Sequence, residues 1–225
     1  MHASGAAGRL RGKTPLECIR CRSHTDGVRV GILLYDAVDL LDAGGPYEVF
    51  LTASRLRIRD GAEPPFEVLT LTRDGAAVTA HGGLRLLPHA GLDAAGVLDL
   101  VVVPGTTDVD RVLSDAGVLA AARTLCAGGR LVASVCTGAF ILAEIGLLDG
   151  LAWTTHWEDI DDLSQRIGPE GAVRGVRWVD SGDVVTGGGL SSGIAMALHL
   201  VDRLAGRDLA ERTARQLDYD WTGGG

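Results

Sequence analysis

Cys136 stands where a buried strand would turn into a helix, an arrangement that exposes a nucleophile. The preceding residues, Leu131–Val135, are apolar or small, as in a buried strand. Thr137, Gly138 and Ala139 open a run of small and aliphatic residues that predicts a helix. Strand, nucleophile and tight turn together form a nucleophile elbow. N–H groups at the helix N-terminus favour a thiolate, so we expect a lowered pKa for Cys136; the alternative is a buried structural cysteine.

The other cysteines, Cys18, Cys21 and Cys126, share no repeated spacing with Cys136, and four cysteines do not make a disulfide scaffold in a chain of 225 residues. Cys18 and Cys21 have the spacing of a zinc or redox pair, but no second ligand pair accompanies them. We therefore interpret them as two free thiols, and we predict neither a metal site nor a cofactor.

The composition argues against several kinds of partner. A formal net charge of -8 works against attraction to nucleic-acid phosphates, which needs clustered Lys and Arg, so we expect no nucleic-acid partner. The longest apolar runs, such as residues 98–103, are far shorter than the ~20 residues that cross a bilayer, and no apolar signal segment follows the basic start. We expect a soluble, cytoplasmic protein without membrane association.

The elements that would position Cys136 alternate between strand and helix. We expect strands over residues 28–35, 66–72, 98–103, 130–135 and 152–155, and hairpins over 78–87 and 176–186. We expect helices starting at Pro46 and over residues 110–126, 138–147, 157–167, 191–204 and 208–217. This alternation predicts an α/β fold: a doubly wound, mainly parallel sheet flanked by helices, a flavodoxin-like sandwich with ligands at the carboxyl ends of the strands.

The two ends of the chain are rich in glycine and polar residues without periodicity. We therefore expect a flexible N-terminal extension over residues 1–27, a single domain over 28–220 and a disordered tail over 221–225.

Five short segments follow one another in a recognisable order: Leu40-Leu41-Asp42-Ala43-Gly44-Gly45-Pro46, Ser134-Val135-Cys136-Thr137-Gly138, Gly146-Leu147-Leu148-Asp149-Gly150, Thr154-Thr155-His156-Trp157 and Thr186-Gly187-Gly188-Gly189. Together they resemble the landmarks of the ThiJ/PfpI superfamily, and within it the isonitrile hydratase subfamily and the sensor domain of AraC-type regulators. The resemblance spans nearly all of residues 28–217. Several motifs in order are a specific signal, whereas any one alone would be weak.

The resemblance implies roles for three residues. Cys136 would be the nucleophile, and Asp42 would bring its carboxylate near the sulfur from the loop after the first strand and act as acid and base. Thr137 would help to shape the site. Asp36 and Asp39 are nearby rivals, but only Asp42 stands in a Leu-Asp-x-x-Gly-Pro context. The alternative for Asp42 is a structural role as the N-cap of the following helix.

Pro104-Gly105 ends a central strand at the same sheet edge as Cys136. Backbone N–H groups of Gly105, Thr106 and Thr137 would therefore be placed to stabilise charge on a bound substrate. The superfamily usually has two glycines after this proline, and Thr106 replaces the second one, which leaves the pocket shape open.

His156 allows two interpretations. It could line the pocket and hydrogen-bond to the substrate, or it could be a satisfied structural imidazole at a strand end. Protease and several glyoxalase-type relatives place a histidine directly after the cysteine, where this chain has Thr137. That difference disfavours a triad and favours chemistry by Cys136 and Asp42.

Three functions remain open for a protein of this type. The first is hydration of an isonitrile to an N-substituted formamide by Cys136 and Asp42. The second is glyoxalase or deglycase-like action on reactive carbonyls, with Asp42 or His156 as base. The third is a small-molecule or redox sensor, although an AraC-type regulator normally carries a C-terminal helix-turn-helix region and this chain stops at Gly225. The resemblance also implies a homodimer, with a small molecule as substrate.

Overall fold

The computed structural model describes residues 27–223 of the chain. Within these residues the main sheet has seven strands in the order β5-β2-β1-β6-β7-β9-β8, and they run parallel except for β8. The strands are β1 (Val28–Leu33), β2 (Phe66–Thr72), β5 (Ala90–Gly91), β6 (Leu100–Val103), β7 (Leu131–Val135), β8 (Trp178–Asp180) and β9 (Val184–Gly187). The expected doubly wound, mainly parallel sheet is confirmed.

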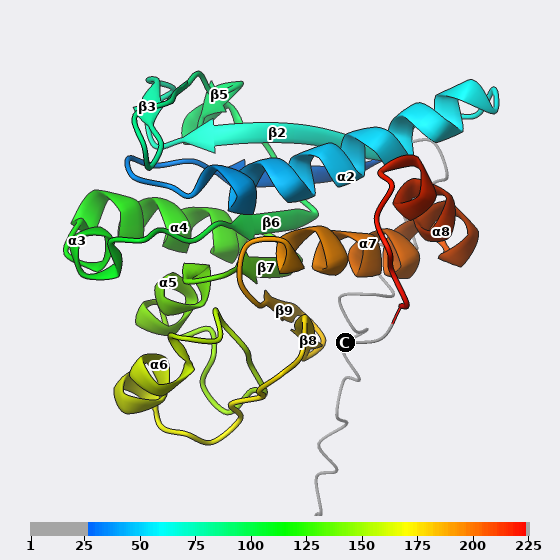
Figure 1. The fold of residues 1–225 in the computed structure, drawn as a ribbon. Coiled ribbons are helices and arrows are strands. Elements are labelled where there is room, and N and C mark those ends of the chain that lie inside the picture. The colour runs from blue at the N-terminus through cyan, green and yellow to red at the C-terminus, as the bar shows by residue number, and fades with distance from the viewer. Residues whose placement is uncertain (1–26, 224–225) are drawn as a thin grey trace, which may run out of the picture.

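Two groups of helices cover the sheet (Figure 1). The first group packs together and consists of α2 (Leu40–Arg59), α7 (Ser192–Ala205) and α8 (Arg207–Gln216). The second packs together along β6 and β7 and consists of α3 (Val109–Leu113), α4 (Ala116–Gly128) and α5 (Gly138–Glu144). Outside these groups lie α6 (Ile160–Ile167), the short 3-10 helix η1 (Leu92–Ala94) and the expected hairpin of β3 (Val78–Thr79) and β4 (Arg85–Leu86).

The central strands are buried along their whole length, which explains why their sequences are apolar without alternation. No residue of β6 or β7 is exposed. A parallel strand with helices on both faces has no solvent side, so every position selects an apolar or small residue. Burial of each large aliphatic side chain stabilises the fold by about 1.5–3 kcal/mol. The core therefore fixes the strand ends from which the reactive side chains project.

Helix α2 begins at Leu40 and not, as expected, at Pro46. Asp39 is its N-cap, because its carboxylate accepts a first-turn N–H at 3.1 Å. Pro46 lies inside the helix, although a proline there removes one helical hydrogen bond. Packing of α2 against α7 and α8 outweighs that local cost. Asp42 consequently lies in the first turn of α2 and not in a loop, and it is not the N-cap.

Two more expectations about regular structure were wrong. The helix expected after β6 is two helices, because Asp115 caps α4 and interrupts the run. No strand forms over residues 152–155, where Trp153 makes only an isolated bridge. Helix α6 starts at Ile160, so His156 stands in the turn before it.

The carboxyl ends of β1, β6 and β7 meet at one edge of the sheet. Strand β1 pairs with β2 on one side and β6 on the other, which makes the gap between β1 and β6 the topological switch point. The Tyr35 hydroxyl closes this gap by donating to the carbonyl of Pro104 at 2.6 Å. Cys136 follows β7, the next strand along.

At the C-terminal end, Trp221 is half-buried and the centre of its ring lies 4.6 Å from the Arg207 guanidinium. The N-terminal extension expected over residues 1–27 lies almost wholly outside the described residues. Between residues 27 and 223, none of the helices combines the length and the apolar character that crossing a membrane would require.

Candidate active site

Cys136 occupies the strained turn that was expected for a nucleophile elbow. Its φ is 55°, in the left-handed region that side chains rarely adopt. The Cys136 N–H donates to the carbonyls of Gly187 and Gly188 at 3.2 and 2.9 Å, which holds the turn in place. Gly138 follows because a Cβ there would overlap the carbonyl of Val103. The Cys136 residue is only 8% exposed, so the turn is largely shielded from solvent.

Asp42 lies in the first turn of α2, and its carboxylate extends to Gly105, beside the turn that carries Cys136 and Thr137. The residue is completely buried, and its Oδ2 accepts the N–H of Gly105 at 3.1 Å. A Cβ on Gly105 would stand 2.8 Å from Asp42 Oδ2 and 2.5 Å from Thr137 Oγ1. The missing side chain of Gly105 therefore lets the carboxylate and the Thr137 hydroxyl converge. Asp42 Oδ1 has no hydrogen-bond partner among the residues that the structure describes.

The two rival aspartates have other partners. Asp36 Oδ1 accepts the N–H of Thr79 at 2.8 Å, which ties β3 to the loop after β1. Asp39 caps α2. Asp39 still acts on Asp42, because its negative charge helps to raise the pKa of that carboxyl.

Burial sets the proton affinity of both reactive groups. It raises the pKa of Asp42 to about 7, together with the charge of Asp39, while the Gly105 N–H and the Cys136 thiol lower that pKa in part. It also raises the pKa of Cys136 to about 12, with Asp42 as the second cause. Backbone N–H groups of Thr137 and Leu190 act in the opposite direction and offset only part of this rise. The expected lowering of the Cys136 pKa by the helix N-terminus is therefore wrong: desolvation and a facing carboxylate dominate.

The expected set of N–H donors for substrate charge needs correction as well. The N–H of Gly105 donates to Asp42, and the N–H of Thr106 donates to Thr137 Oγ1 at 2.8 Å. The Thr137 hydroxyl donates in turn to the Thr106 carbonyl at 2.6 Å. Both backbone groups are thus engaged by side chains of the site. The backbone N–H groups that lower the pKa of Cys136 are those of Thr137 and Leu190.

His156 lies beside the loop that carries Leu190. Its Nδ1 is 3.2 Å from Asp159 Oδ2, and a Cβ on Gly189 would overlap the imidazole ring. Its neighbour Thr155 donates a hydrogen bond from its hydroxyl to the Cys136 carbonyl at 2.8 Å. The segment around His156 therefore packs directly against the turn that carries Cys136.

Three residues of the site were not predicted from the sequence: Tyr35, Asp159 and Leu190. The buried Tyr35 has a raised pKa, caused by burial and by the charges of Asp42 and Cys136. Asp159 also raises the pKa of Cys136 and stands three residues after His156, a spacing that could have suggested an ion pair. Leu190 has a φ of 43°, a left-handed conformation that the sequence does not predict for a leucine.

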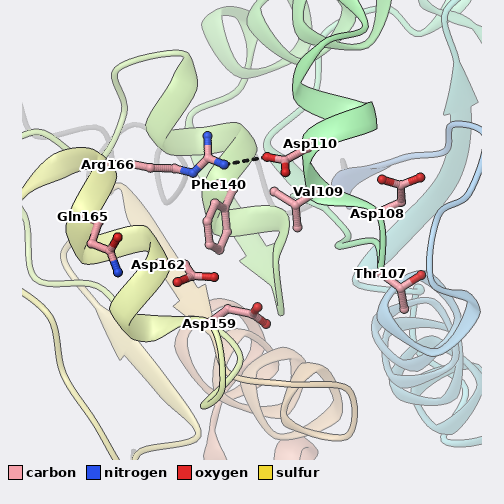
Figure 2. A pocket seen from close by; sticks show the side chains of 9 residues that line it. All are labelled: Thr107, Asp108, Val109, Asp110, Phe140, Asp159, Asp162, Gln165 and Arg166. Carbon is pink, nitrogen blue, oxygen red and sulfur yellow. Dashed lines mark hydrogen bonds and ion pairs between the residues drawn. The ribbon is translucent and has the colours of Figure 1, made fainter.

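A cavity of about 510 Å³ opens between α3 and α6 and is called the α3–α6 cavity below. Figure 2 shows Arg166 and Asp110 bridging one end of it above Phe140, with an ion pair of 2.7 Å. Asp159 lines it and links it electrostatically to Cys136. The lining residues are Thr107, Asp108, Val109, Asp110, Phe140, Asp159, Asp162, Gln165 and Arg166.

A second cavity of about 320 Å³ is lined by residues that include His156, Trp157 and Leu190. Cys136 lines neither cavity. Each cavity is lined by one residue that acts on the pKa of Cys136: Asp159 in the α3–α6 cavity and Leu190 in the second.

No group of three or more His, Cys, Asp or Glu side chains in residues 27–223 is arranged to hold a metal ion. The pair Cys18 and Cys21 lies outside the described residues.

Comparison with known proteins identifies similar chains. Residues 28–203 match the model of the DJ-1/PfpI family. Isonitrile hydratase of Pseudomonas putida is 35% identical over 192 residues, which are 85% of this chain and 78% of that protein. The HTH-type transcriptional regulator GbdR of Pseudomonas aeruginosa is 30% identical over 85% of this chain, which spans only 50% of the regulator. A solved structure, a ThiJ/PfpI family protein from Pseudomonas syringae, superposes with a TM-score of 0.74 at 26% identity, covering 97% of this chain and 83% of that one.

Proposed function

The chain belongs to the DJ-1/PfpI family, and from this membership we propose that it is a cysteine-dependent hydro-lyase that converts an isonitrile into an N-substituted formamide. The observation that carries the proposal is the convergence of the buried Asp42 carboxylate and the Cys136 turn around Gly105. The similarity to an isonitrile hydratase over 85% of the chain supports the same assignment.

The first half of the reaction moves one proton from the Cys136 thiol to Asp42 and then to the substrate. Asp42 takes the proton of the Cys136 thiol, and the thiolate forms a bond to the isonitrile carbon. Asp42 then returns that proton to the same carbon, which leaves a thioimidate on the sulfur. With a pKa of about 7, Asp42 can both accept and donate this proton near neutral pH.

The second half of the reaction uses the same carboxylate. Asp42 removes a proton from water, the oxygen bonds to the thioimidate carbon, and the proton goes to nitrogen. The carbon–sulfur bond then breaks while the hydroxyl proton returns through Asp42 to the sulfur, which releases the formamide and the Cys136 thiol. N–H groups of Thr137 and Leu190 stabilise the sulfur whenever it carries negative charge.

We assign the organic substituent of the isonitrile to the α3–α6 cavity (Figure 2). Its volume of about 510 Å³ suits a small organic group. Phe140 offers an apolar contact, and the carboxylates of Asp159 and Asp162 offer hydrogen-bond acceptors.

The test is release of formamide from a simple alkyl or aryl isonitrile by the purified protein, measured together with lactate formation from methylglyoxal. Formamide release that disappears in Cys136→Ala supports the proposal. Lactate formation without formamide release would assign the protein to the glyoxalase class. Absence of both activities, with a small molecule still binding at Cys136, would favour a sensor like the matching part of the regulators.

We also propose that the protein acts as a cytoplasmic homodimer. The dimer follows from family resemblance and the location from the short apolar runs of the sequence, and light scattering of the purified protein during gel filtration tests the dimer. A mass near 23.4 kDa, that of one chain, would refute the dimer.

A further inference from the structure

The loop of residues 188–191 lies against the turn that carries Cys136, because the Cys136 N–H donates to the carbonyl of Gly188 at 2.9 Å. From the same loop, the Leu190 N–H is one of the groups that lower the pKa of Cys136. Leu190 itself has a φ of 43°, which a branched side chain adopts only where the surroundings hold it. The loop therefore needs outside support if its N–H is to keep its direction.

Two residues outside the loop provide contacts at both of its ends. At the first end, the Gly188 N–H donates to the backbone carbonyl of Arg177 at 2.9 Å. At the other, the Tyr219 hydroxyl donates to the backbone carbonyl of Ser191 at 3.3 Å. The guanidinium of Arg177 joins the two by donating to the Tyr219 hydroxyl at 2.8 Å and lying 5.8 Å from its ring centre.

We propose that Arg177 and Tyr219 are positioning residues, called the clamp below, that hold both ends of the loop of residues 188–191, and so keep the Gly188 carbonyl and the Leu190 N–H in place against the turn that carries Cys136. The inference deepens the proposed function and rests on it for the catalytic role of Cys136. Neither residue touches the sulfur; both act through the loop. Because Arg177 is exposed and Tyr219 is half-buried, water competes for these hydrogen bonds, and each contributes a modest amount.

Other groups also govern the Cys136 thiol and must be kept constant. Asp42 faces it from α2, Tyr35 from the end of β1, and Asp159 from the turn before α6. His156 pairs with Asp159 in that turn. The clamp residues belong to none of these elements, so changing them leaves the charges around the sulfur in place.

The experiment is alkylation of Cys136 by iodoacetamide over a pH series, followed by peptide mass mapping with the buried Cys126 as internal reference. Tyr219→Phe keeps the ring and removes the hydroxyl. We expect Cys136 in this variant to react about three- to tenfold more slowly, as for loss of one hydrogen bond, and its pH dependence to move to higher pH. Arg177→Gln should have a similar effect, and the double variant should not add the two.

Trp221→Phe is the matched control. It also replaces one aromatic ring by another in the C-terminal segment, and its indole Nε1 has no hydrogen-bond partner among the described residues. The control should alkylate like the wild type, and all variants should unfold at similar temperatures. Wild-type alkylation in Tyr219→Phe, or equal slowing in Trp221→Phe, would overturn the clamp. Alkylation needs no isonitrile, so a wild type without hydratase activity would refute the proposed function and leave this test intact.

Discussion

Asp42 and Cys136 influence each other's pKa. The charge of Asp42 helps to raise the pKa of the Cys136 thiol to about 12, and the Cys136 thiol partly lowers the pKa of Asp42, which is about 7. Two groups coupled in this way titrate as a pair. Below about pH 7 the pair holds two protons, and above it holds one. The single remaining proton can sit on sulfur or on the carboxylate, and this form is the one that the proposed reaction uses.

The pH dependence of turnover follows from this pairing. We expect kcat/KM for an isonitrile to fall as pH falls through about 7, because the second proton leaves neither group able to act as base. No further loss is expected on the alkaline side until about pH 12. A rate that is constant across neutral pH, with binding unchanged, would contradict the role of the pair.

Separate replacement of the two buried cysteines, Cys136 and Cys126, should distinguish a catalytic role of a thiol from a packing role. Cys136→Ala should abolish formamide release, because the variant lacks the thiol that forms the thioimidate in the proposed reaction. Cys126→Ala removes an equally buried thiol from α4 and should retain activity. Both thiols have a pKa raised to about 12, mainly by burial, so the difference must come from the position of Cys136. Equal activities in the two variants would refute the nucleophile assignment.

Gly105→Ala tests the close approach of the reactive groups. The new Cβ would stand 2.5 Å from Thr137 Oγ1 and 2.8 Å from Asp42 Oδ2, so one or both must move. A displacement of this size should lower kcat on the order of 10²-fold. The control is Gly44→Ala in α2, where a Cβ meets nothing within 4 Å. It should leave kcat unchanged and stabilise the helix by about 0.5–1 kcal/mol.

The fold and the main site residues could be predicted, but their geometry could not. Unbroken apolar runs identified β6 and β7, because buried parallel strands tolerate little else. The spacing of small residues around Cys136 predicted the turn. The start of α2 was missed because Pro46 follows a local rule that tertiary packing overrides.

The proton affinities were missed for a different reason. A helix N-terminus was expected to lower the pKa of Cys136, but the size of the desolvation effect depends on how closely Asp42 and the sheet surround the sulfur. Leu190 and Asp159 act on Cys136 from segments more than twenty residues away in sequence, through contacts that only the folded chain brings together.

The charge of the α3–α6 cavity should determine which isonitriles react well. Four aspartates line it, Asp108, Asp110, Asp159 and Asp162, against the single cation Arg166, which is paired with Asp110. An isonitrile with an ammonium substituent should therefore have a lower KM than one with a carboxylate, by several-fold for partly exposed charges. Added salt should reduce the difference. Asp162→Asn should weaken the preference, and a preference for the carboxylate would place the substituent elsewhere.

Asp42→Asn should make the protein less active and more stable at the same time. The pKa of Asp42 rises from 3.8 to about 7 on folding, so the neutral form favours the folded state. Stability from this group is fully present below about pH 4 and is lost as pH rises through about 7, a loss of up to about 4 kcal/mol. Asn stays neutral and still offers an oxygen to the N–H of Gly105. Denaturant unfolding should therefore show the variant to be more stable than the wild type at pH 8 but not at pH 4.

The same variant lacks a transferable proton, so formamide turnover above about pH 7, where the wild type is most active, should fall by about 10²–10⁴-fold. The loss should appear in kcat more than in KM, because Asp42 does not line the α3–α6 cavity to which the substituent is assigned. A variant with full activity would reduce Asp42 to a structural carboxylate. If the unfolding free energy of the variant changes with pH as much as that of the wild type, Asp42 is not the group whose raised pKa makes the wild type less stable at high pH.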